Sequence, residues 1–516
     1  MPTVTEHGSR HGAFLCTARE KDDTKRKQAQ VRSSAKREAA GHPLPLRPCV
    51  RPFLSAEGGL PKEASFPKER GLLQEGGRRA GGPRGRRIGR SVRPAAVLLL
   101  VMVLTGCGFV TSPGNSDGSG ATSGNGDVVG TPTPLRNVPR ELSTVADGKL
   151  VVYRMPGIQG NRIKATAMLF TPRKSPPAGG WPLLVWGHGT VGWAPECAPS
   201  VQLQEHGKWA DGPNAALLAA VLKMGIAVVA PDYEGLGPTA AGVTTGHGYY
   251  HLSSEGKSMV FAAVAAKRYL GGRASGEWVP AGWSEGGFSA LAAAYYSRLP
   301  KKAEPALDYR GTIALAPVPD VPAMNKVLWR DIANASKPGT VPTDHQISQL
   351  VFANAETIYF TKTQRYAGYG IDPERIYGQN MLKFYQQDWR TCIDDLNAKV
   401  KRDIKNYLNS SPSHRLASYP GIRGDAPNSL PENRRFFARN QGKLENSTLP
   451  GSVLWLYGTD DITSPATVTY HVVNKMLANA NDINLAIFEG AGHYDVPVVG
   501  LPLIQARLRQ LFPLKS

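Results

Sequence analysis

The 516-residue sequence predicts an α/β fold with a mostly parallel central sheet, helices on both faces and an inserted, mainly helical cap. Three observations predict it. Short, continuously apolar runs of strand length alternate with helical runs, which is typical of a parallel sheet covered by helices. One strand–turn–helix stretch, residues 278–296, carries the pattern Gly282-Trp-Ser284-Glu-Gly286. Between residues 318 and 449 the strand pattern stops and helical spacing replaces it.

The expected elements follow in order from residue 145. Residues 150–153 and 163–170 should open the sheet as an antiparallel pair. Further strands are expected at 182–186, 226–230, 278–281, 312–316, 452–457 and 484–488, and helices at 215–224, 255–270, 288–296, 344–360 and 378–392. Gly225 should end the first of these helices, and Ser253 or Ser254 should cap the second. The core is therefore expected in two parts, 145–319 and 451–516, with the cap at 320–450.

The N-terminal segment, residues 1–93, differs from the rest in composition. It holds 21 Lys and Arg against 9 Asp and Glu, and it lacks apolar periodicity. We expect either a disordered basic arm or an extension that is not translated, and we favour the second. A nucleic-acid partner does not follow from the charge, because no aromatic-interleaved basic patch or binding motif accompanies it.

Residues 94–107 have the pattern of a lipoprotein signal peptide. Basic residues precede a short apolar run that ends in Leu104-Thr-Gly-Cys107. The last four residues resemble the bacterial lipobox, in which the cysteine is acylated; the alternative is a buried strand that ends in a cysteine. Residues 108–144, rich in Gly, Ser, Asn and Asp in their first part, should then form a flexible linker. We expect an exported protein, anchored by lipid at Cys107 to the cell surface or periplasmic face of a bacterial membrane.

Two cysteines remain in the expected folded part, Cys197 and Cys392. Disulfides persist in the compartments that exported proteins occupy. We therefore predict a Cys197–Cys392 bridge, with two free thiols as the alternative.

The chemistry is expected at three strand ends. Ser284 lies at the apex of the Gly-x-Ser-x-Gly turn, and two later strands end in residues 458–461 and 489–493, which supply a carboxylate and His493. The order Ser, Asp, His is that of the triad of the α/β-hydrolase fold. His493 would take the serine proton, and an aspartate would fix the imidazole tautomer. Asp460 and Asp461 both qualify; we prefer Asp460, which has an apolar residue two positions on.

An oxyanion hole needs backbone donors close to the nucleophile. One is expected to be the N–H of Glu285, directly after Ser284. The other should come from the loop after strand 182–186, at Gly189 or Thr190. His188 in the same loop has either a structural or a functional role, because only backbone amides are required.

Three segments resemble a known family. Residues 187–200 (Gly-His-Gly-Thr…Cys-Ala-Pro-Ser), 231–235 (Pro-Asp-Tyr-Glu-Gly) and 282–287 are similar to motifs of the secretory lipases, the group that includes the fungal lipase A type. The resemblance runs over about residues 145–516. It implies hydrolysis of carboxylic esters, often acyl lipids, with a helical cap over the site. It also implies that Asp232 contributes to the oxyanion hole, although a turn-forming role is the alternative.

The expected function is that of a membrane-anchored serine esterase or lipase acting on a small-molecule or lipid ester. Neither a metal nor an organic cofactor is expected. A serine peptidase of the same fold and a non-catalytic surface lipoprotein are the alternatives. The complete Ser, Asp and His set argues against the second, since a binding protein has no need of all three.

Overall fold

The computed structural model describes residues 124–512, except 213, 239–245, 338–339 and 425. The expectations for residues 1–93, for the signal peptide with Cys107 and for the linker up to residue 123 lie outside the described residues. None of the helices in the described ranges is long and apolar enough to cross a bilayer.

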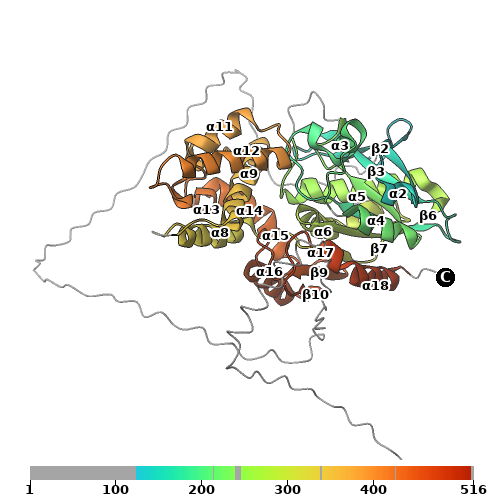
Figure 1. The fold of residues 1–516 in the computed structure, drawn as a ribbon. Helices are drawn as coiled ribbons and strands as arrows, with labels where there is room; N and C mark the ends of the chain where they lie inside the picture. The colour runs from blue at the N-terminus through green and yellow to red at the C-terminus, as the bar shows by residue number, and fades with distance from the viewer. Residues whose placement is uncertain (1–123, 213, 239–245, 338–339, 425, 513–516) are drawn as a thin grey trace, which may run out of the picture. The chain divides into compact units, whose positions relative to one another are not determined.

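The described strands form one mixed sheet in the order β1-β2-β3-β5-β4-β6-β8-β9-β10, with β7 paired to β6 (Figure 1). The strands are β1 (Thr133–Pro134), β2 (Ala146–Pro156), β3 (Arg162–Pro172), β4 (Trp181–Gly187), β5 (Ala227–Pro231), β6 (Ala274–Trp283), β7 (Asp308–Tyr309), β8 (Thr312–Leu315), β9 (Ser452–Gly458) and β10 (Asp482–Phe488). The pairs β1–β2, β2–β3 and β3–β5 are antiparallel, and all the others are parallel. The predicted α/β fold with a mostly parallel sheet is confirmed.

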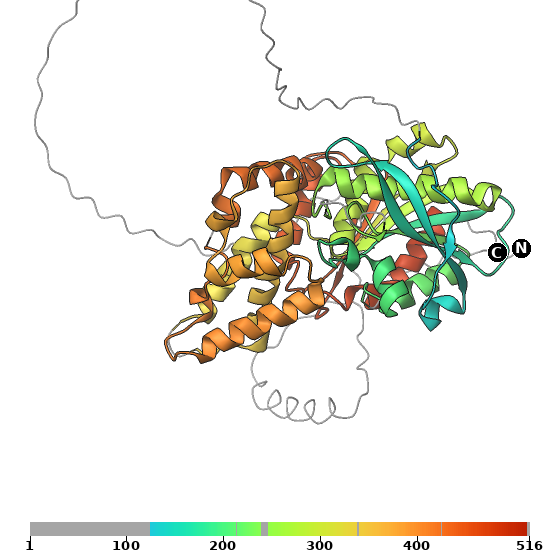
Figure 2. The ribbon, with the colours of Figure 1, turned by 90° about the horizontal axis from the view of Figure 1, so that it is seen from above.

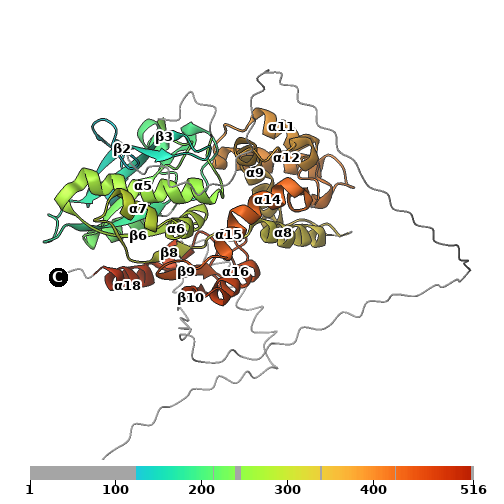
Figure 3. The same cartoon turned by 180° about the vertical axis from the view of Figure 1, so that it is seen from behind.

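Helices cover both faces of this sheet because successive strand residues point to opposite sides. On β4, Leu184 and Trp186 join the core under α4 (Asn214–Lys223) and α18 (Leu501–Leu511). Leu183 and Val185 instead join the core under α5 (Leu252–Leu270). Alongside α5 on that face lies α6 (Glu285–Tyr295) (Figures 1 and 3). A strand buried on both faces must be apolar throughout, which is why the runs in the sequence were continuous.

The remaining helices of the core are short or lie near its edges. They are α2 (Arg140–Ser143), α3 (Pro199–His206), α7 (Arg298–Ala303), α16 (Ala466–Ala478) and α17 (Val496–Val499). The expected helix end at Gly225 agrees with its φ of 82° just after α4. The expected serine cap of α5 is wrong: the N-cap is His251, whose side chain accepts a hydrogen bond from the N–H of Ser254.

Part of the segment expected to be a flexible linker is structured. Thr133 pairs with Leu150 of β2, and Val128 forms an isolated bridge to Tyr153. Arg268 of α5 holds the Asp127 carboxylate at 2.7 Å and the Asn125 carbonyl at 3.1 Å. These contacts with β2 and α5 hold the segment on the folded core, which its polar composition did not indicate.

A block of helices stands between β8 and β9. It comprises α8 (Val321–Ala335), α9 (Asp344–Tyr366), α10 (Pro373–Ile376), α11 (Gln379–Gln387), α12 (Ile393–Asn409), α13 (Ala426–Ser429), α14 (Pro431–Arg439) and α15 (Gln441–Glu445), which lie together in Figure 2. The long helices α9 and α12 are antiparallel neighbours. Lys405 contacts Asp344 at 3.1 Å at one end, and the Tyr359 hydroxyl donates to the Thr391 carbonyl at 2.7 Å near the other. We refer to this block as the cap.

Candidate active site

Ser284 occupies a strained turn between β6 and α6. Its φ of 61° and ψ of −122° lie where residues other than glycine are rare. The two glycines of the motif are needed for close approach. A Cβ on Gly282 would lie 2.2 Å from the carbonyl oxygen of Gly286, and one on Gly286 would lie 2.0 Å from that of Gly187. The turn therefore presents Ser284 at the N-terminus of α6, where the helix dipole favours a developing negative charge.

The histidine and its carboxylate come from the ends of the last two strands. His493 follows β10, and its Nδ1 lies 2.7 Å from Oδ2 of Asp461, which follows β9. The other oxygen of Asp461 accepts hydrogen bonds of 2.8 Å from the N–H groups of Thr463 and Ser464. Asp461 is buried and fixed in orientation, as the partner of a catalytic imidazole should be.

The preference for Asp460 does not agree with this geometry. The Asp460 side chain is exposed, and it accepts a hydrogen bond from the neighbouring Thr459 hydroxyl at 3.1 Å. Its backbone N–H donates to the Ala491 carbonyl at 3.1 Å, so the residue helps hold the two strand-end loops together. Of the two candidates, the structure brings only Asp461 to the imidazole.

Trp283 joins the nucleophile turn to the histidine loop. Its Nε1 donates a hydrogen bond of 3.0 Å to the carbonyl of His493, and the two rings lie 5.1 Å apart. Ser284 and His493 line one cavity of about 420 Å³. Residues more than 200 positions apart are thus brought to one edge of the sheet.

Gly189 and Thr190, the two candidate oxyanion donors in the loop after β4, differ in the contacts they make. The N–H of Gly189 already donates to Oδ1 of Asp211 at 3.2 Å, whereas Thr190 lines the cavity with Ser284. The backbone of Thr190 is therefore the better candidate. Glu285, the other expected donor, is the first residue of α6, so its N–H belongs to the unpaired first turn of that helix.

Asp211 was missed by the sequence reasoning. It is buried and accepts a hydrogen bond of 2.6 Å from the Trp186 indole, besides those from Gly189 and the Asn214 side chain. Burial raises the pKa of its carboxyl to about 7, and these hydrogen bonds oppose the rise. It lies three residues before α4, outside the N-cap position, so no capping pattern in the sequence marked it. It holds the candidate oxyanion loop in place.

Asp232 lies elsewhere than the family resemblance implied. Its carboxylate accepts hydrogen bonds from the N–H and hydroxyl of Ser200, at 3.0 and 2.5 Å, and from the Thr166 hydroxyl at 2.6 Å. It is fully buried, does not line the cavity, and burial raises its pKa to about 6. These contacts tie α3 to β3 and to the turn after β5. They account for Asp232 as a structural residue and give no support to an oxyanion role.

His188 is also held inside the protein. Its Nδ1 lies 2.7 Å from the Gly189 carbonyl oxygen and its ring packs on Tyr233 at 4.3 Å. Burial lowers the pKa of the imidazole to about 3, so it is neutral at ordinary pH. This geometry favours the structural interpretation of His188.

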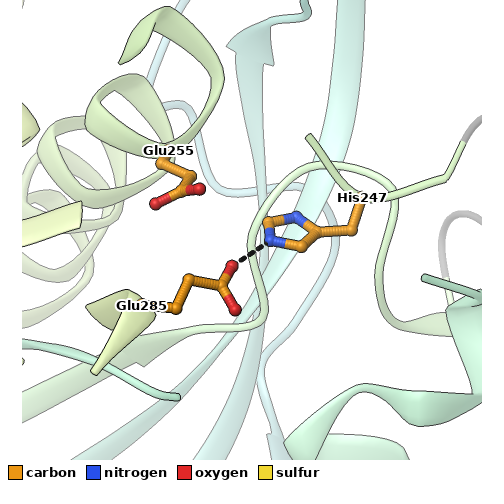
Figure 4. A group of neighbouring side chains, drawn as sticks. All are labelled: His247, Glu255 and Glu285. Atoms are coloured by element: carbon orange, nitrogen blue, oxygen red, sulfur yellow. Dashed lines mark hydrogen bonds and ion pairs between the residues drawn. The ribbon is translucent and has the colours of Figure 1, made fainter. Parts of the chain in front are cut away.

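A buried group of acidic residues lies behind the nucleophile turn. The carboxylate of Glu285 is hydrogen bonded to Nε2 of His247, and Glu255 lies beside them (Figure 4). Burial raises the pKa of both carboxyls and lowers that of His247 to about 4. The three side chains could offer a metal ion one ligand atom each, within 4.8 Å of one another. However, Glu255 already accepts from the Tyr250 N–H and the Ser289 hydroxyl, and His247 is committed to Glu285. The arrangement instead tethers the residue that follows Ser284.

Cys197 and Cys392 form a disulfide bond with their Cα atoms 5.4 Å apart. Cys197 ends the short 3-10 helix Pro195–Cys197 in the core, and Cys392 is the N-cap of α12. The bond therefore joins the loop after the candidate oxyanion donor to the cap. A Cβ on Gly192 would lie 2.7 Å from Sγ of Cys197, so glycine is needed beside it.

Fold and site together define an α/β hydrolase. The chain belongs to the alpha/beta hydrolase family, whose model matches residues 183–501. No match was found among curated protein sequences.

Solved structures show the same fold at low sequence identity. The rice cell wall degrading esterase LipA from Xanthomonas oryzae is 16% identical with a TM-score of 0.54, over 75% of this chain and 99% of that one. Candida antarctica lipase A is 15% identical with a TM-score of 0.55, over 76% and 83% of the two chains. A putative hydrolase from Legionella pneumophila is 17% identical with a TM-score of 0.51, over 75% and 99%. The resemblance to the lipase A type is thereby confirmed in fold.

Proposed function

We propose that the protein hydrolyses carboxylic esters through an acyl-enzyme, with Ser284 as nucleophile, His493 as general base and acid, and Asp461 as its partner. The observation that carries the proposal is the 2.7 Å contact of His493 with Asp461 beside the cavity that Ser284 lines from a strained turn. The fold it shares with an esterase and a lipase supports the same reaction.

The reaction follows from the positions of these groups. His493 takes the proton of Ser284 as its oxygen attacks the ester carbonyl, and Asp461 stabilises the resulting imidazolium. The backbone N–H groups of Glu285 and Thr190 receive the negative charge on the carbonyl oxygen. His493 then protonates the departing alcohol, and a water molecule activated by the same imidazole releases the acid. Every proton in this cycle passes through His493.

The test is turnover of a series of p-nitrophenyl esters by the full chain, beside Ser284→Ala. Removal of the nucleophile should lower kcat by roughly 10⁶-fold while circular dichroism and melting stay unchanged. Ser413→Ala, an exposed serine of the cap, is the matched control and should keep full turnover. Residual activity of Ser284→Ala near that of the wild type would exclude this mechanism.

We further propose that the protein is exported and held at a bacterial membrane by lipid on Cys107. The motif ending in Cys107 supports this, and a disulfide between Cys197 and Cys392 is compatible with an oxidising compartment. Cys107→Ser should move the protein from the membrane fraction to the soluble one. An unchanged distribution would refute the anchor.

A further inference from the structure

One carboxylate in the catalytic cavity has no part in the proposed ester chemistry. Glu356 of α9 lines the same cavity as the core residues Ser284 and His493, and only 5% of its surface is exposed. It also borders a second, smaller and mainly apolar cavity of about 20 Å³ between α9 and the segment that begins α8. A carboxyl group in this position lies in the cavity that any substrate of Ser284 must enter.

Glu356 has no cationic partner among the described ion pairs. Burial raises the pKa of the Glu356 carboxyl, and the nearby Glu285 carboxyl raises it further. The Thr190 hydroxyl lowers it. Burial without a counter-ion therefore favours the neutral form of this carboxyl, and a ligand that supplies a positive charge would favour its ionised form.

Three ionisable residues of the cap line the cavity, Glu356 on α9 and Asp394 and Lys401 on α12, and they lie at different positions along these helices. The contacts Asp344–Lys405 and Tyr359–Thr391 fix the antiparallel register of α9 and α12. In that register Glu356 lies near the Asp394 end of α12, and Lys401 lies near Ser348, two turns further out. At 1.5 Å per residue this separates Lys401 from Glu356 by roughly 12 Å along the helices.

Asp394 also lines the cavity, but its carboxylate is exposed and already paired with Lys208 at 2.8 Å. Glu356 is therefore the carboxyl at the catalytic end of the cavity that has no cationic partner among the described ion pairs, and a bound cation would favour its ionised form. Four aromatic side chains line the same space: Trp209, Trp283, Phe352 and Tyr494. Aromatic faces attract cations through their ring quadrupole, and they do so more strongly where water is excluded.

We propose that this cavity selects esters that carry an ammonium group close to the reacting carbonyl, with Glu356 as the counter-ion of that group. The proposal rests on the ester hydrolysis proposed above and names its substrate class. An uncharged long-chain acyl ester would leave Glu356 without a counter-ion, so such lipids are not the substrates that fit best. The ammonium can belong to the alcohol or to the acyl half of the ester, since both pass the same wall.

Two pairs of esters test the proposal, each pair matched in shape and differing in charge. For the alcohol side, acetylcholine is compared with 3,3-dimethylbutyl acetate. For the acyl side, the ethyl ester of trimethylammonioacetate is compared with ethyl 3,3-dimethylbutanoate. Acid release by the full chain gives kcat/KM for each ester, and the ratio within a pair is compared between variants, so that intrinsic reactivity cancels.

The expected result is a ratio that favours the cationic ester in at least one pair, and a fall of that ratio by roughly 10-fold or more in Glu356→Gln. Glu356→Asp should restore part of it. Glu432→Gln is the matched control: Glu432 is also a buried cap carboxylate, but it pairs with Arg375 and does not line the cavity. Its ratios should equal those of the wild type.

Equal ratios in the wild type and Glu356→Gln would overturn the proposal, as would a wild type that hydrolyses p-nitrophenyl acetate but neither cationic ester. If Glu356→Gln does not fold, competition in the wild type decides: choline should inhibit p-nitrophenyl acetate turnover more strongly than 3,3-dimethylbutanol, and equal inhibition would count against the ammonium site. Absence of turnover for every ester would instead contradict the proposed ester hydrolysis itself.

Discussion

The cavity has two walls that are built in different ways. On the core wall, Ser284 and His493 follow strand ends, and backbone contacts fix their positions: a methyl group at Gly286 would meet the Gly187 carbonyl at 2.0 Å. On the cap wall, Glu356 and Asp394 are side chains on the faces of two helices. A substitution on the core wall should therefore change the turnover of all esters, and one on the cap wall should change their ranking.

The largest difference is expected between Asp460 and Asp461, two adjacent aspartates that follow β9 in the core. Asp461→Asn should lower kcat by about 10⁴-fold, because an amide at this position favours the wrong imidazole tautomer and cannot stabilise the imidazolium. Asp460→Asn, one residue away and exposed, should retain nearly full activity. Steady-state kinetics on a p-nitrophenyl ester measure both. The opposite order would show that the 2.7 Å contact between His493 and Asp461 is not the catalytic one.

A second comparison concerns two bonds that join the core to the cap, one covalent and one ionic. The Cys197–Cys392 disulfide closes a loop with a sequence separation of 195 residues. Its removal in the double variant Cys197→Ser/Cys392→Ser should lower the free energy of unfolding by about 4 kcal/mol, chiefly because the unfolded chain is no longer constrained. The variant's midpoint in denaturant measures this.

The matched control for the disulfide is Lys208→Ala, which removes an exposed ion pair across the same boundary. An exposed pair contributes less than about 1 kcal/mol. An equal loss of stability in the control and in the disulfide variant would show that the disulfide adds no constraint of its own.

The sequence predicted what depends on local pattern. The strands around Ser284 are continuous apolar runs because both faces of the sheet are covered, and Gly-x-Ser-x-Gly needs its glycines within five residues. Whether Asp460 or Asp461 meets the imidazole depends on the direction each side chain takes from one turn, and adjacent residues with the same chemistry carry no signal for that. Glu356 could not be placed, because its position in the cavity depends on how α9 packs against a core that is distant in sequence.

The smallest predicted effect concerns Asp211, which holds the candidate oxyanion loop and whose pKa burial raises to about 7. Since this pKa is above that of the unfolded chain, the folded protein binds the extra proton, and the associated stability is lost as pH rises through about 7. From about pH 5.5 to about pH 7.5 the wild type should lose about 2 kcal/mol that Asp211→Asn, which has no proton to lose, does not. Denaturant titrations of both variants at each pH measure the difference, and other titrating groups contribute equally to both. Parallel pH profiles of the two variants would contradict the raised pKa of Asp211. They would mean that its three hydrogen bonds keep the carboxyl ionised over this pH range, and that the loop after β4 is held equally well in acid and in alkali.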